Sequence, residues 1–465
     1  MCPSLTPSPI RKKTKKMRKP SHLPLFALIL LLLLPLSLAF AEPLQECHKV
    51  QMDKVDTTQA NKSVIRIWTV DTVLDSVDDE IRSIEDAYAQ RLGPDLPKAG
   101  SSANANSRVD VEVRYSRTGL TWMSFVIQAR TTYHRDLTGQ EITSRTYDMT
   151  SGERILLSDI FPLGSDAWQI LAQAVRTQLT AYFPKEIPDE GILDELCSVE
   201  GLLDAPFSLH GLSLVLHYPA YLLYPGHYTL MEVTLMYPDI RPYMTARAQT
   251  ETDNLTYYKT VALTFDDGPV RTNSTLVLQS LMTVGCRGTF FVVGNRISAY
   301  DDLVQREHDE GHAHGYHNWH HGTVTKSSAT ALRAMKTKCD TAMLAAIGTI
   351  ATYDRVPYGL YPEMIKAQVG WPYIQWSLDT YDWRGKSTNA VLSTVKKEIQ
   401  DGDIILCHDI KDNTPESARQ ICLTLMERGY MFLTIDELFA KDGVVLEPDT
   451  VYFHCVDGDT TIRKN

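Results

Sequence analysis

Five short motifs follow one another in the C-terminal half of the 465-residue chain, and their side chains are suited to hydrolysis. Hydrolysis of an amide or ester needs a base, an acid, a carbonyl-polarising group and a donor for the oxyanion. Each motif alone is a weak signal, but together and in this order they predict a metal-dependent hydrolytic site. The motifs are Thr264-Phe265-Asp266-Asp267-Gly268-Pro269, His317 with His321, Arg355-Val356-Pro357-Tyr358-Gly359, Asp382-Trp383 and Leu406-Cys407-His408.

Two histidines and a carboxylate are the candidate metal ligands. His317 and His321 are four residues apart, a spacing that places two imidazoles on one face of a helical turn. Asp266 and Asp267 are adjacent, so at a strand end they should point apart, one toward a metal and the other toward the water it activates. This ligand set leaves positions for water and substrate. On spacing alone, other histidines leave the choice of pair open: His308, His312, His314 and His320.

The remaining motifs predict supporting roles. Arg355 is a candidate fixed cation that orients Asp266 and keeps it ionised. Tyr358 lies between a proline and a glycine, so its backbone N–H could reach an oxyanion. Asp382 could pair with His408 and raise its pKa, so that His408 protonates the leaving group. Each residue also has an ordinary reading, as a turn residue, a surface charge or a strand-end histidine.

A strand, loop and helix rhythm begins at Lys259 and predicts the elements that position these residues. Short apolar strands that alternate with amphipathic helices indicate a parallel sheet. Seven such units fit a closed or nearly closed barrel better than an open sheet, and all five motifs fall at strand ends, where barrels carry their chemistry. The predicted strands are Val261–Phe265, Gly288–Val293, His312–Tyr316, Tyr353–Val356, Tyr373–Leu378, Ile404–Leu406 and Met431–Thr434. The predicted helices are Thr275–Val284, Leu303–Glu310, Ser328–Ile347, Glu363–Val369, Asn389–Gln400 and Glu416–Arg428.

The preceding region, residues 61–246, has an antiparallel α+β pattern. Residues 109–115 alternate strictly between apolar and polar side chains, as a half-buried strand does. Residues 93–106 are rich in Gly, Ser, Asn and Pro and predict a mobile loop. Further strands are predicted at Leu120–Tyr133, Glu141–Met149, Phe207–Tyr218 and Tyr228–Tyr237, with a helix at Ser165–Phe183.

Length and composition predict two folded domains and a few connecting segments. We expect a linker at 42–60, an α+β accessory domain at 61–246, a second linker at 247–257, a catalytic domain at 258–440 and a C-terminal tail at 441–465 with one strand at Val451–Val456. The net charge is -11 although residues 1–41 carry seven positive side chains and no acid. The rest of the chain is therefore acidic, which argues against nucleic acid as a partner.

Residues 1–41 read as a signal peptide or a membrane anchor. A basic stretch precedes an apolar run at residues 23–40, and Ala39-Phe40-Ala41 has the small-x-small pattern of a cleavage site. The run approaches the roughly 18–20 residues that span a bilayer, so membrane anchoring through it is the alternative. Both interpretations place the rest of the chain outside the cytoplasm, as a secreted, cell-wall associated or membrane-anchored protein.

The chain has eight cysteines and no Cys-x-x-Cys pair, so a cysteine zinc site is not expected. Three cysteines lie in apolar runs and are predicted to be buried free thiols: Cys286, Cys407 and Cys422.

Residues of about 258–440 resemble the polysaccharide deacetylases, the NodB-homology domain of carbohydrate esterase family four. The resemblance rests on the five motifs and on the stretch from His408 to Thr414. It implies an α/β fold, a distorted (β/α) barrel that binds one divalent metal, usually Zn²⁺, with Co²⁺ or Mn²⁺ as alternatives. Asn318 departs from the Ser or Thr that the family often has after its first histidine.

The resemblance also implies a role for each motif residue. The metal ligands would be Asp267, His317 and His321. The catalytic residues would be Asp266 as base, Arg355 holding it, His408 as acid and Asp382 tuning that acid. The Tyr358 N–H would bind the oxyanion, while Trp383 and Leu406 would line the pocket for the acetyl methyl group.

The upstream region resembles the smaller α+β domain that often precedes bacterial peptidoglycan deacetylases, most clearly over residues 212–228. The combined reading is an exported hydrolase that removes N-acetyl groups from amino sugars of cell-wall peptidoglycan and releases acetate. One alternative is the same chemistry on chitin oligomers or acetylxylan. Another is a non-catalytic protein that binds or senses the wall and whose barrel is a relic.

Overall fold

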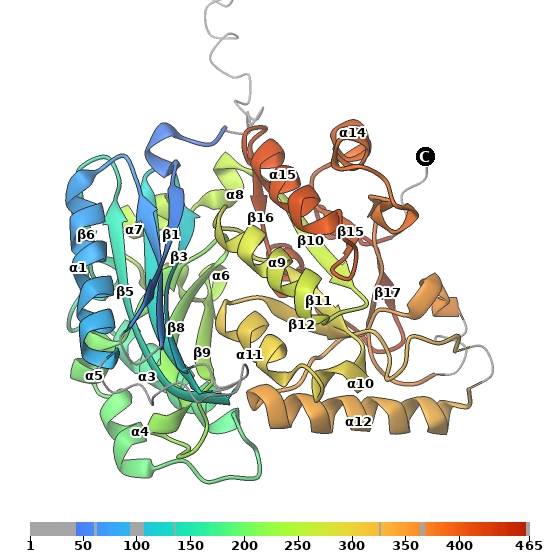
Figure 1. The fold of residues 1–465 in the computed structure, drawn as a ribbon, viewed down its shortest axis with the longest axis horizontal. Helices are drawn as coiled ribbons and strands as arrows, with labels where there is room; N and C mark the ends of the chain where they lie inside the picture. Colours follow the sequence, from blue (N-terminus) through green and yellow to red (C-terminus); the bar gives the residue numbers. More distant parts are fainter. Residues whose placement is uncertain are drawn as a thin grey trace, which may run out of the picture. The chain divides into compact units, whose positions relative to one another are not determined.

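Parallel strands form the centre of the C-terminal region (Figure 1). The computed structural model describes residues 43–59, 63–93, 107–133, 136–324, 327–362 and 368–461. The main sheet has the strand order β12-β11-β10-β15-β14, and β16 pairs with the first half of β10. Its members, with two short partners, are β10 (Lys259–Asp266), β11 (Thr289–Val292), β12 (Ala313–Tyr316), β13 (Tyr373–Ile374), β14 (Leu378–Asp379), β15 (Asp403–His408), β16 (Tyr430–Phe432) and β17 (Val451–Tyr452).

A distorted barrel is closed by one interrupted strand, whose two halves are β13 and β14. On one side, Ile374 N donates to Asp354 O at 2.9 Å, and Asp354 forms a parallel bridge to Tyr316 of β12. On the other side, Ser377 N donates to Ile404 O of β15 at 3.1 Å. The predicted barrel is therefore confirmed, with an isolated bridge at Asp354 in place of the predicted strand Tyr353–Val356.

Helices cover the outside of these strands (Figure 1). Val261, Leu263 and Phe265 of β10 pack in one apolar cluster with residues of α9 and α15. Because side chains alternate along a strand, Thr264 and Asp266 point the other way, into the barrel. The helices of this region are α9 (Arg271–Met282), α10 (Gly294–Ile297), α11 (Asp301–Asp309), α12 (Ala329–Ile347), α14 (Thr388–Glu398), α15 (Thr414–Met426) and α16 (Ile435–Ala440).

The N-terminal region contains two further sheets, and its antiparallel α+β character is as predicted. Six strands have the order β1-β2-β3-β4-β5-β6, and every neighbouring pair is antiparallel except β2 and β3. They are β1 (Gln51–Thr58), β2 (Val64–Asp71), β3 (Ser107–Thr118), β4 (Trp122–Tyr133), β5 (Asp136–Asp148) and β6 (Glu153–Ile155). The smaller sheet consists of β7 (Phe207–Leu209), β8 (Ser213–Pro219) and β9 (Leu230–Met236).

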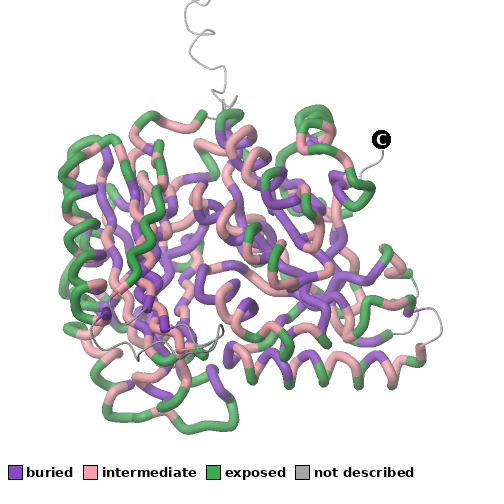
Figure 2. The backbone as a smooth tube through the Cα atoms, in the orientation of Figure 1, coloured by how far each residue is buried: buried purple, intermediate pink, exposed green. Residues whose placement is uncertain are grey.

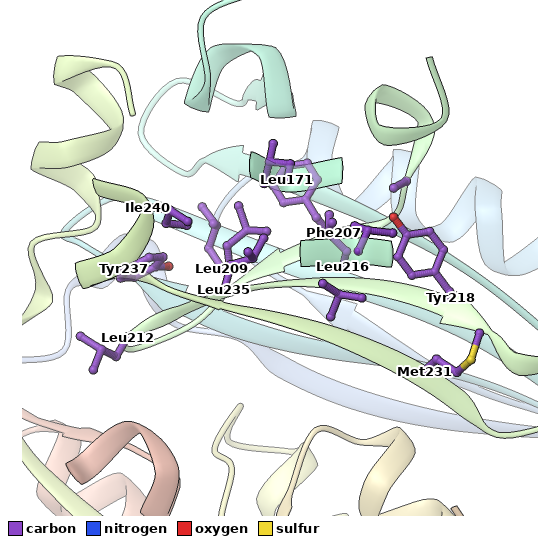
Figure 3. Packing of buried hydrophobic residues seen from close by; sticks show 14 of the residues in the cluster. Leu171, Phe207, Leu209, Leu212, Leu216, Tyr218, Met231, Leu235, Tyr237 and Ile240 are labelled. Atoms are coloured by element: carbon purple, nitrogen blue, oxygen red, sulfur yellow. The ribbon is translucent and has the colours of Figure 1, made fainter. Parts of the chain in front are cut away.

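Apolar side chains of the smaller sheet pack against helix α3 (Figure 3). Leu171 of this helix lies over Phe207, Leu216 and neighbouring strand residues, all of them buried. The same apolar cluster includes Phe291 and other residues of the barrel, so the two regions share part of their core. The helices here are α1 (Asp75–Leu92), α2 (Leu157–Ile160), α3 (Ala167–Ala181), α4 (Glu190–Leu196), α5 (Val199–Asp204), α6 (Tyr237–Ile240), α7 (Ala246–Glu251) and α8 (Asn254–Tyr257).

Three segments predicted to be linkers or a tail belong to the ordered fold. Within the predicted linker 42–60, β1 pairs with β2 along its whole length. Its residues are nearly all exposed (Figure 2), so it lacks the apolar alternation that would have revealed it. The predicted linker 247–257 forms α7 and α8, and Asn254 at the start of α8 accepts from Gly119 N and donates to Gly211 O.

The predicted C-terminal tail is the third correction. Its strand β17 pairs with β13 of the barrel and is shorter than predicted. Tyr452 and Cys455 are buried. Cys455 N donates to Gly402 O at 3.0 Å, next to the start of β15. The sequence predicted a strand here but not its pairing with the barrel, because backbone pairing leaves no periodic pattern.

Some sequence expectations fall outside the described residues. These are the signal or anchor at residues 1–41, most of the loop at 93–106 and most of the helix at 363–369. In the part of the chain that is described, no helix combines the length and apolar character needed to cross a bilayer. The described residues, all within 43–461, form one compact unit, and the division into two domains stays a prediction. The seven described cysteines are free thiols, and Cys286, Cys407 and Cys422 are buried as predicted.

Replacing Tyr452 by alanine tests whether the C-terminal segment belongs to the fold. Its ring packs against Phe439 at a centroid distance of 5.2 Å, and its hydroxyl accepts from Glu447 N at 2.7 Å. We expect Tyr452→Ala to lower the free energy of unfolding by about 3 kcal/mol or more, because it leaves a cavity. Urea unfolding measures this. Val445→Ala, at a position that is 74% exposed, should stay within about 0.5 kcal/mol of wild type; equal effects would contradict the assignment.

Candidate metal centre and catalytic site

A fully buried arginine, Arg355, occupies the barrel interior directly below the ends of the strands. Its Nη1 donates to Asp266 Oδ1 at 2.8 Å and to Thr264 Oγ1 at 2.7 Å. Its Nε and Nη2 each donate at 3.0 Å to the carbonyls of Ile374 and Gln375. Burial lowers the pKa of Arg355, and the Asp266 carboxylate opposes that shift. The predicted contact between Arg355 and Asp266 is therefore present, as a buried ion pair.

The three candidate metal ligands lie together above this pair. Asp267 Oδ1 is 3.1 Å from His321 Nε2 and 3.5 Å from His317 Nε2. One ligand atom from each residue can be chosen so that all three lie within 4.8 Å of one another. They come from the end of β10 and from the loop after β12. The structure thus brings together the pair 317/321, rather than another pair from the histidine-rich stretch.

The donor chemistry of this cluster fits a divalent cation. His317 Nδ1 is 2.8 Å from the carbonyl oxygen of Arg355, to which it can only donate, so its Nε2 keeps a free lone pair. Asp267 Oδ1 is buried and has no hydrogen-bond partner in the described part of the chain. Burial lowers the pKa of His317, against the effect of Asp266 and Asp267, which favours the neutral imidazole that a ligand must be. Two imidazoles and a carboxylate suit zinc and similar ions.

The loop after β12 does not place the histidines as predicted. Residues 317–321 form a bend and not a helical turn. Asn318 has a left-handed backbone with φ 62°, and its side-chain oxygen accepts from Trp319 N at 2.8 Å. Asparagine tolerates this conformation better than most residues do. The bend, helped by Asn318, brings the two rings to a centroid distance of 5.0 Å.

The two adjacent aspartates do not point apart either. Asp267 has φ 79°, outside the strand conformation, so alternation ends at Asp266. An oxygen of Asp266 lies 3.7 Å from His317 Nε2, and an oxygen of Asp267 lies 3.5 Å from the same atom. The two carboxylates therefore face the same small volume. Their different surroundings, with Arg355 beside Asp266 only, still distinguish them.

A histidine and aspartate pair completes the site at the end of β15. His408 Nδ1 is 2.8 Å from Asp382 Oδ1, and His408 N donates to Asp382 Oδ2 at 2.7 Å. Burial lowers the pKa of His408, but the hydrogen bond and charge of Asp382 outweigh it, so the net pKa is raised. Burial likewise raises the pKa of Asp382, and the contacts with His408 and Thr414 more than reverse this. The pairing expected from sequence is present.

The three remaining predicted residues surround the same end of the barrel. Tyr358 lies in a 3-10 turn (Pro357–Gly359) with φ 60°, and its ring is 4.6 Å from that of His321. Trp383 is 44% exposed and lies in a second 3-10 turn (Asp382–Arg384). Leu406 is buried on β15, two residues before His408 and so on the same face of the strand.

Comparison with known proteins places this arrangement in a family. Residues 254–371 match the family model described as polysaccharide deacetylase. The peptidoglycan-N-acetylglucosamine deacetylase PgdA of Listeria monocytogenes is 37% identical over 199 residues, which cover 43% of this chain and 42% of that protein. Residues 254–371 belong to the polysaccharide deacetylase family.

Two further members of the family have related sequences. The peptidoglycan-N-acetylmuramic acid deacetylase PdaC of Bacillus subtilis is 32% identical over 39% of this chain and 38% of its own length. A family 4 acetyl xylan esterase from Clostridium thermocellum, solved with a cobalt ion, is 30% identical over 42% of this chain and 98% of that chain, with a TM-score of 0.40. The chain spans about two fifths of the length of the two curated relatives, 42% and 38%.

Sequence reasoning missed several polar residues that support the candidate site. Thr414 Oγ1 donates to Asp382 Oδ2 at 2.7 Å. Asp409 is buried against Gly268, where an added Cβ would lie 2.1 Å from its Oδ2, and Ser274 donates to the same carboxylate. The polar stretch after His408 was noted for its resemblance, but no spacing rule indicates what these side chains touch.

Removing Arg355 should destabilise the protein strongly. Arg355→Met leaves the buried Asp266 carboxylate without its cation, and breaking a buried pair in this way costs about 3–5 kcal/mol. Urea unfolding of wild type and variant measures the change in the free energy of unfolding. Arg419→Met is the control, because that side chain is 41% exposed with an ion pair at 3.8 Å, worth at most about 1 kcal/mol. A cost for Arg355→Met no larger than for the control would contradict the buried-pair assignment.

Proposed function

We propose that the protein is a metal-dependent hydrolase that removes N-acetyl groups from amino sugars of cell-wall peptidoglycan and releases acetate. The observation that carries this proposal is the convergence of Asp267, His317 and His321 beside the Arg355–Asp266 pair and the Asp382–His408 pair. By their names, two of the relatives, PgdA and PdaC, are deacetylases of peptidoglycan sugars. Such a substrate lies outside the cytoplasm, which agrees with the export signal expected at residues 1–41.

Asp267, His317 and His321 would hold the cation, with Zn²⁺ as the first choice and Co²⁺ or Mn²⁺ as alternatives. When bound, a divalent cation lowers the pKa of water and polarises the acetamide carbonyl. Asp267 contributes a negative charge, and the carbonyl of Arg355 fixes the orientation and tautomer of His317. Only three protein ligands are present in the described cluster, which is the ligand count of a catalytic site rather than a closed structural one.

Asp266 and His408 would move the two protons of the reaction. Asp266 takes a proton from water as the water oxygen attacks the carbonyl carbon. Its Oδ1 is held by Arg355, so its Oδ2, 3.7 Å from His317 Nε2, is the atom that faces the reacting volume. His408 then gives a proton to the amine nitrogen as the carbon–nitrogen bond breaks. Its Nδ1 is bound to Asp382, so Nε2 is the donating atom.

The other predicted residues would bind and orient the acetamide. The backbone N–H of Tyr358 would donate to the oxyanion that forms on the carbonyl oxygen. Trp383 and Leu406 would contact the acetyl methyl group, and both belong to segments that also carry the Asp382–His408 pair. The exposed ring of Tyr358, at 62%, is also available to a sugar face.

Acetate release from purified peptidoglycan tests this function directly. We expect release by the zinc-loaded protein, loss of release with a chelator and recovery when zinc is added back. Chitohexaose and acetylxylan, offered in the same assay, address the alternative substrates. Faster release from either of them would identify that glycan, and not peptidoglycan, as the substrate. No release from any of the three would favour a non-catalytic wall-binding protein.

Asp266→Asn tests the assignment of the base within that assay. The amide keeps an acceptor for Arg355 but cannot take a proton, so turnover should fall by about 10²–10⁴-fold. The zinc content per chain should stay at the wild-type value, because the three ligands are unchanged. Turnover close to wild type would refute the assignment of the base. Loss of zinc together with loss of turnover would instead identify Asp266 as a metal ligand.

The pH dependence of turnover tests the assignment of the acid. His408 must be protonated to donate, so turnover should fall as the pH rises through its pKa, which Asp382 raises. In Asp382→Asn the raising effect of Asp382 is lost, while burial still lowers the pKa of His408. The alkaline limb should therefore move to lower pH. Rates measured across the pH range report this shift. The control Asp412→Asn, an exposed position four residues after His408, should leave the limb in place; an unmoved limb in Asp382→Asn would contradict the pairing.

A further inference from the structure

Two cations stand beside the candidate site without a carboxylate partner. Arg384 and Lys386 lie between β14 and α14, directly after Asp382 and Trp383. Among the described residues, no acidic oxygen forms an ion pair with either of them, and Lys386 Nζ has only Thr394 Oγ1 at 3.4 Å. By contrast, Arg271, also in the C-terminal region, is paired with a carboxylate.

Aromatic rings hold these two cations in place. The Arg384 guanidinium carbon is 4.9 Å from the ring centre of Tyr381 and 4.6 Å from that of Trp383. Lys386 Nζ is 4.5 Å from the ring centre of Tyr381. A guanidinium stacked on aromatic faces keeps the N–H groups of its edge free to bind a planar anion. The cluster of Tyr381, Trp383, Arg384 and Lys386 is called here the aromatic–cation cluster.

The backbone of this cluster is fixed relative to the proton donor. Asn413 Nδ2 donates to Lys386 O at 2.7 Å, and Asp379 Oδ1 accepts from Tyr381 N at 2.7 Å. Asp382, inside the same segment, contacts His408 at 2.8 Å. The cations therefore lie two and four residues from the aspartate that would tune the acid. A glycan that places its acetamide nitrogen at His408 would bring its neighbouring substituents to the aromatic–cation cluster.

We propose that the aromatic–cation cluster is a subsite for a carboxylate that the glycan carries close to the reacting N-acetyl group. The inference rests on the proposed function and goes beyond it, because it names an acidic N-acetylated glycan as the preferred substrate class over a neutral one. Arg384 would bind the carboxylate through two N–H groups, and Lys386 would add a second positive charge. Tyr381 and Trp383 keep both cations oriented before the substrate arrives.

Matched oligosaccharides test the subsite. Acetate release is measured for a peptide-free peptidoglycan tetrasaccharide, for the same tetrasaccharide with its carboxylates converted to amides, and for neutral chitotetraose. A peptide-bearing tetrasaccharide is the fourth substrate and distinguishes a carboxylate on the sugar from one on the peptide. We expect the wild type to prefer a free-acid substrate over its amide by about fivefold or more in kcat/KM, mainly through KM. Raising the salt concentration should reduce that preference.

Variants identify which side chains produce the preference. Arg384→Gln should bring the acid-to-amide ratio of kcat/KM close to one, whereas Arg384→Lys, which keeps the charge, should retain part of the preference. Lys386→Gln should lower the ratio by a smaller factor. The control is Lys397→Gln, an exposed lysine at the end of α14, which should leave the ratio unchanged. Circular dichroism and zinc content establish that each variant is folded and loaded.

The outcomes separate this inference from the function on which it rests. Preference for the peptide-free acid places the bound carboxylate on the sugar, and preference for the peptide-bearing acid alone places it on the peptide. Equal rates on acid and amide, or a ratio that Arg384→Gln leaves unchanged, overturn the subsite while acetate release still supports the hydrolase. No acetate from any substrate, with zinc bound, overturns the proposed function and with it the subsite.

Discussion

The ion pair between Arg355 and Asp266 in the barrel interior is the constraint on which the rest of the site depends. A buried guanidinium is costly unless a carboxylate and further hydrogen-bond acceptors surround it. Here Asp266 supplies the charge, and Thr264, Ile374 and Gln375 supply oxygens. Because the arginine is fixed on all sides, the carboxylate that it binds is fixed as well.

The same residue also orients a ligand of the candidate metal centre and contributes to the closure of the barrel. Its carbonyl accepts the Nδ1 proton of His317, which leaves Nε2 for a cation. Its side chain binds the carbonyls of Ile374 and Gln375, where the strand formed by β13 and β14 is interrupted. Those carbonyls would otherwise lack partners in the barrel interior. The irregular closure and the geometry of the candidate site therefore both depend on one buried residue.

The sequence was most informative where chemistry and strand ends coincide. The order of the five motifs and the alternation of apolar strands and helices predicted a barrel whose candidate ligands and proton-transfer residues meet at one end, as Asp267, His317 and His321 do. What it could not predict is local conformation. The left-handed backbones at Asp267 and Asn318 override the simple rules of alternation and helical spacing, because tertiary contacts hold them there.

Two segments without an apolar pattern were not recognised as parts of the sheets, for a related reason. The strand β1 is held by backbone pairing with β2 and has exposed side chains, and β17 consists of only two residues that complete the barrel edge. Backbone hydrogen bonds leave no trace in composition. The polar contacts of Thr414 and Asp409 were invisible likewise, since they join residues that only the fold brings together.

The central claim is that one cation is held by Asp267, His317 and His321. Titration of the metal-free protein with zinc, followed by calorimetry, tests it most directly. The account predicts one zinc per chain for the wild type, and loss of that binding in both His317→Ala and His321→Ala, with His320→Ala unaffected. Stoichiometric binding that survives the loss of either ligand histidine, or no binding by the wild type, would contradict it.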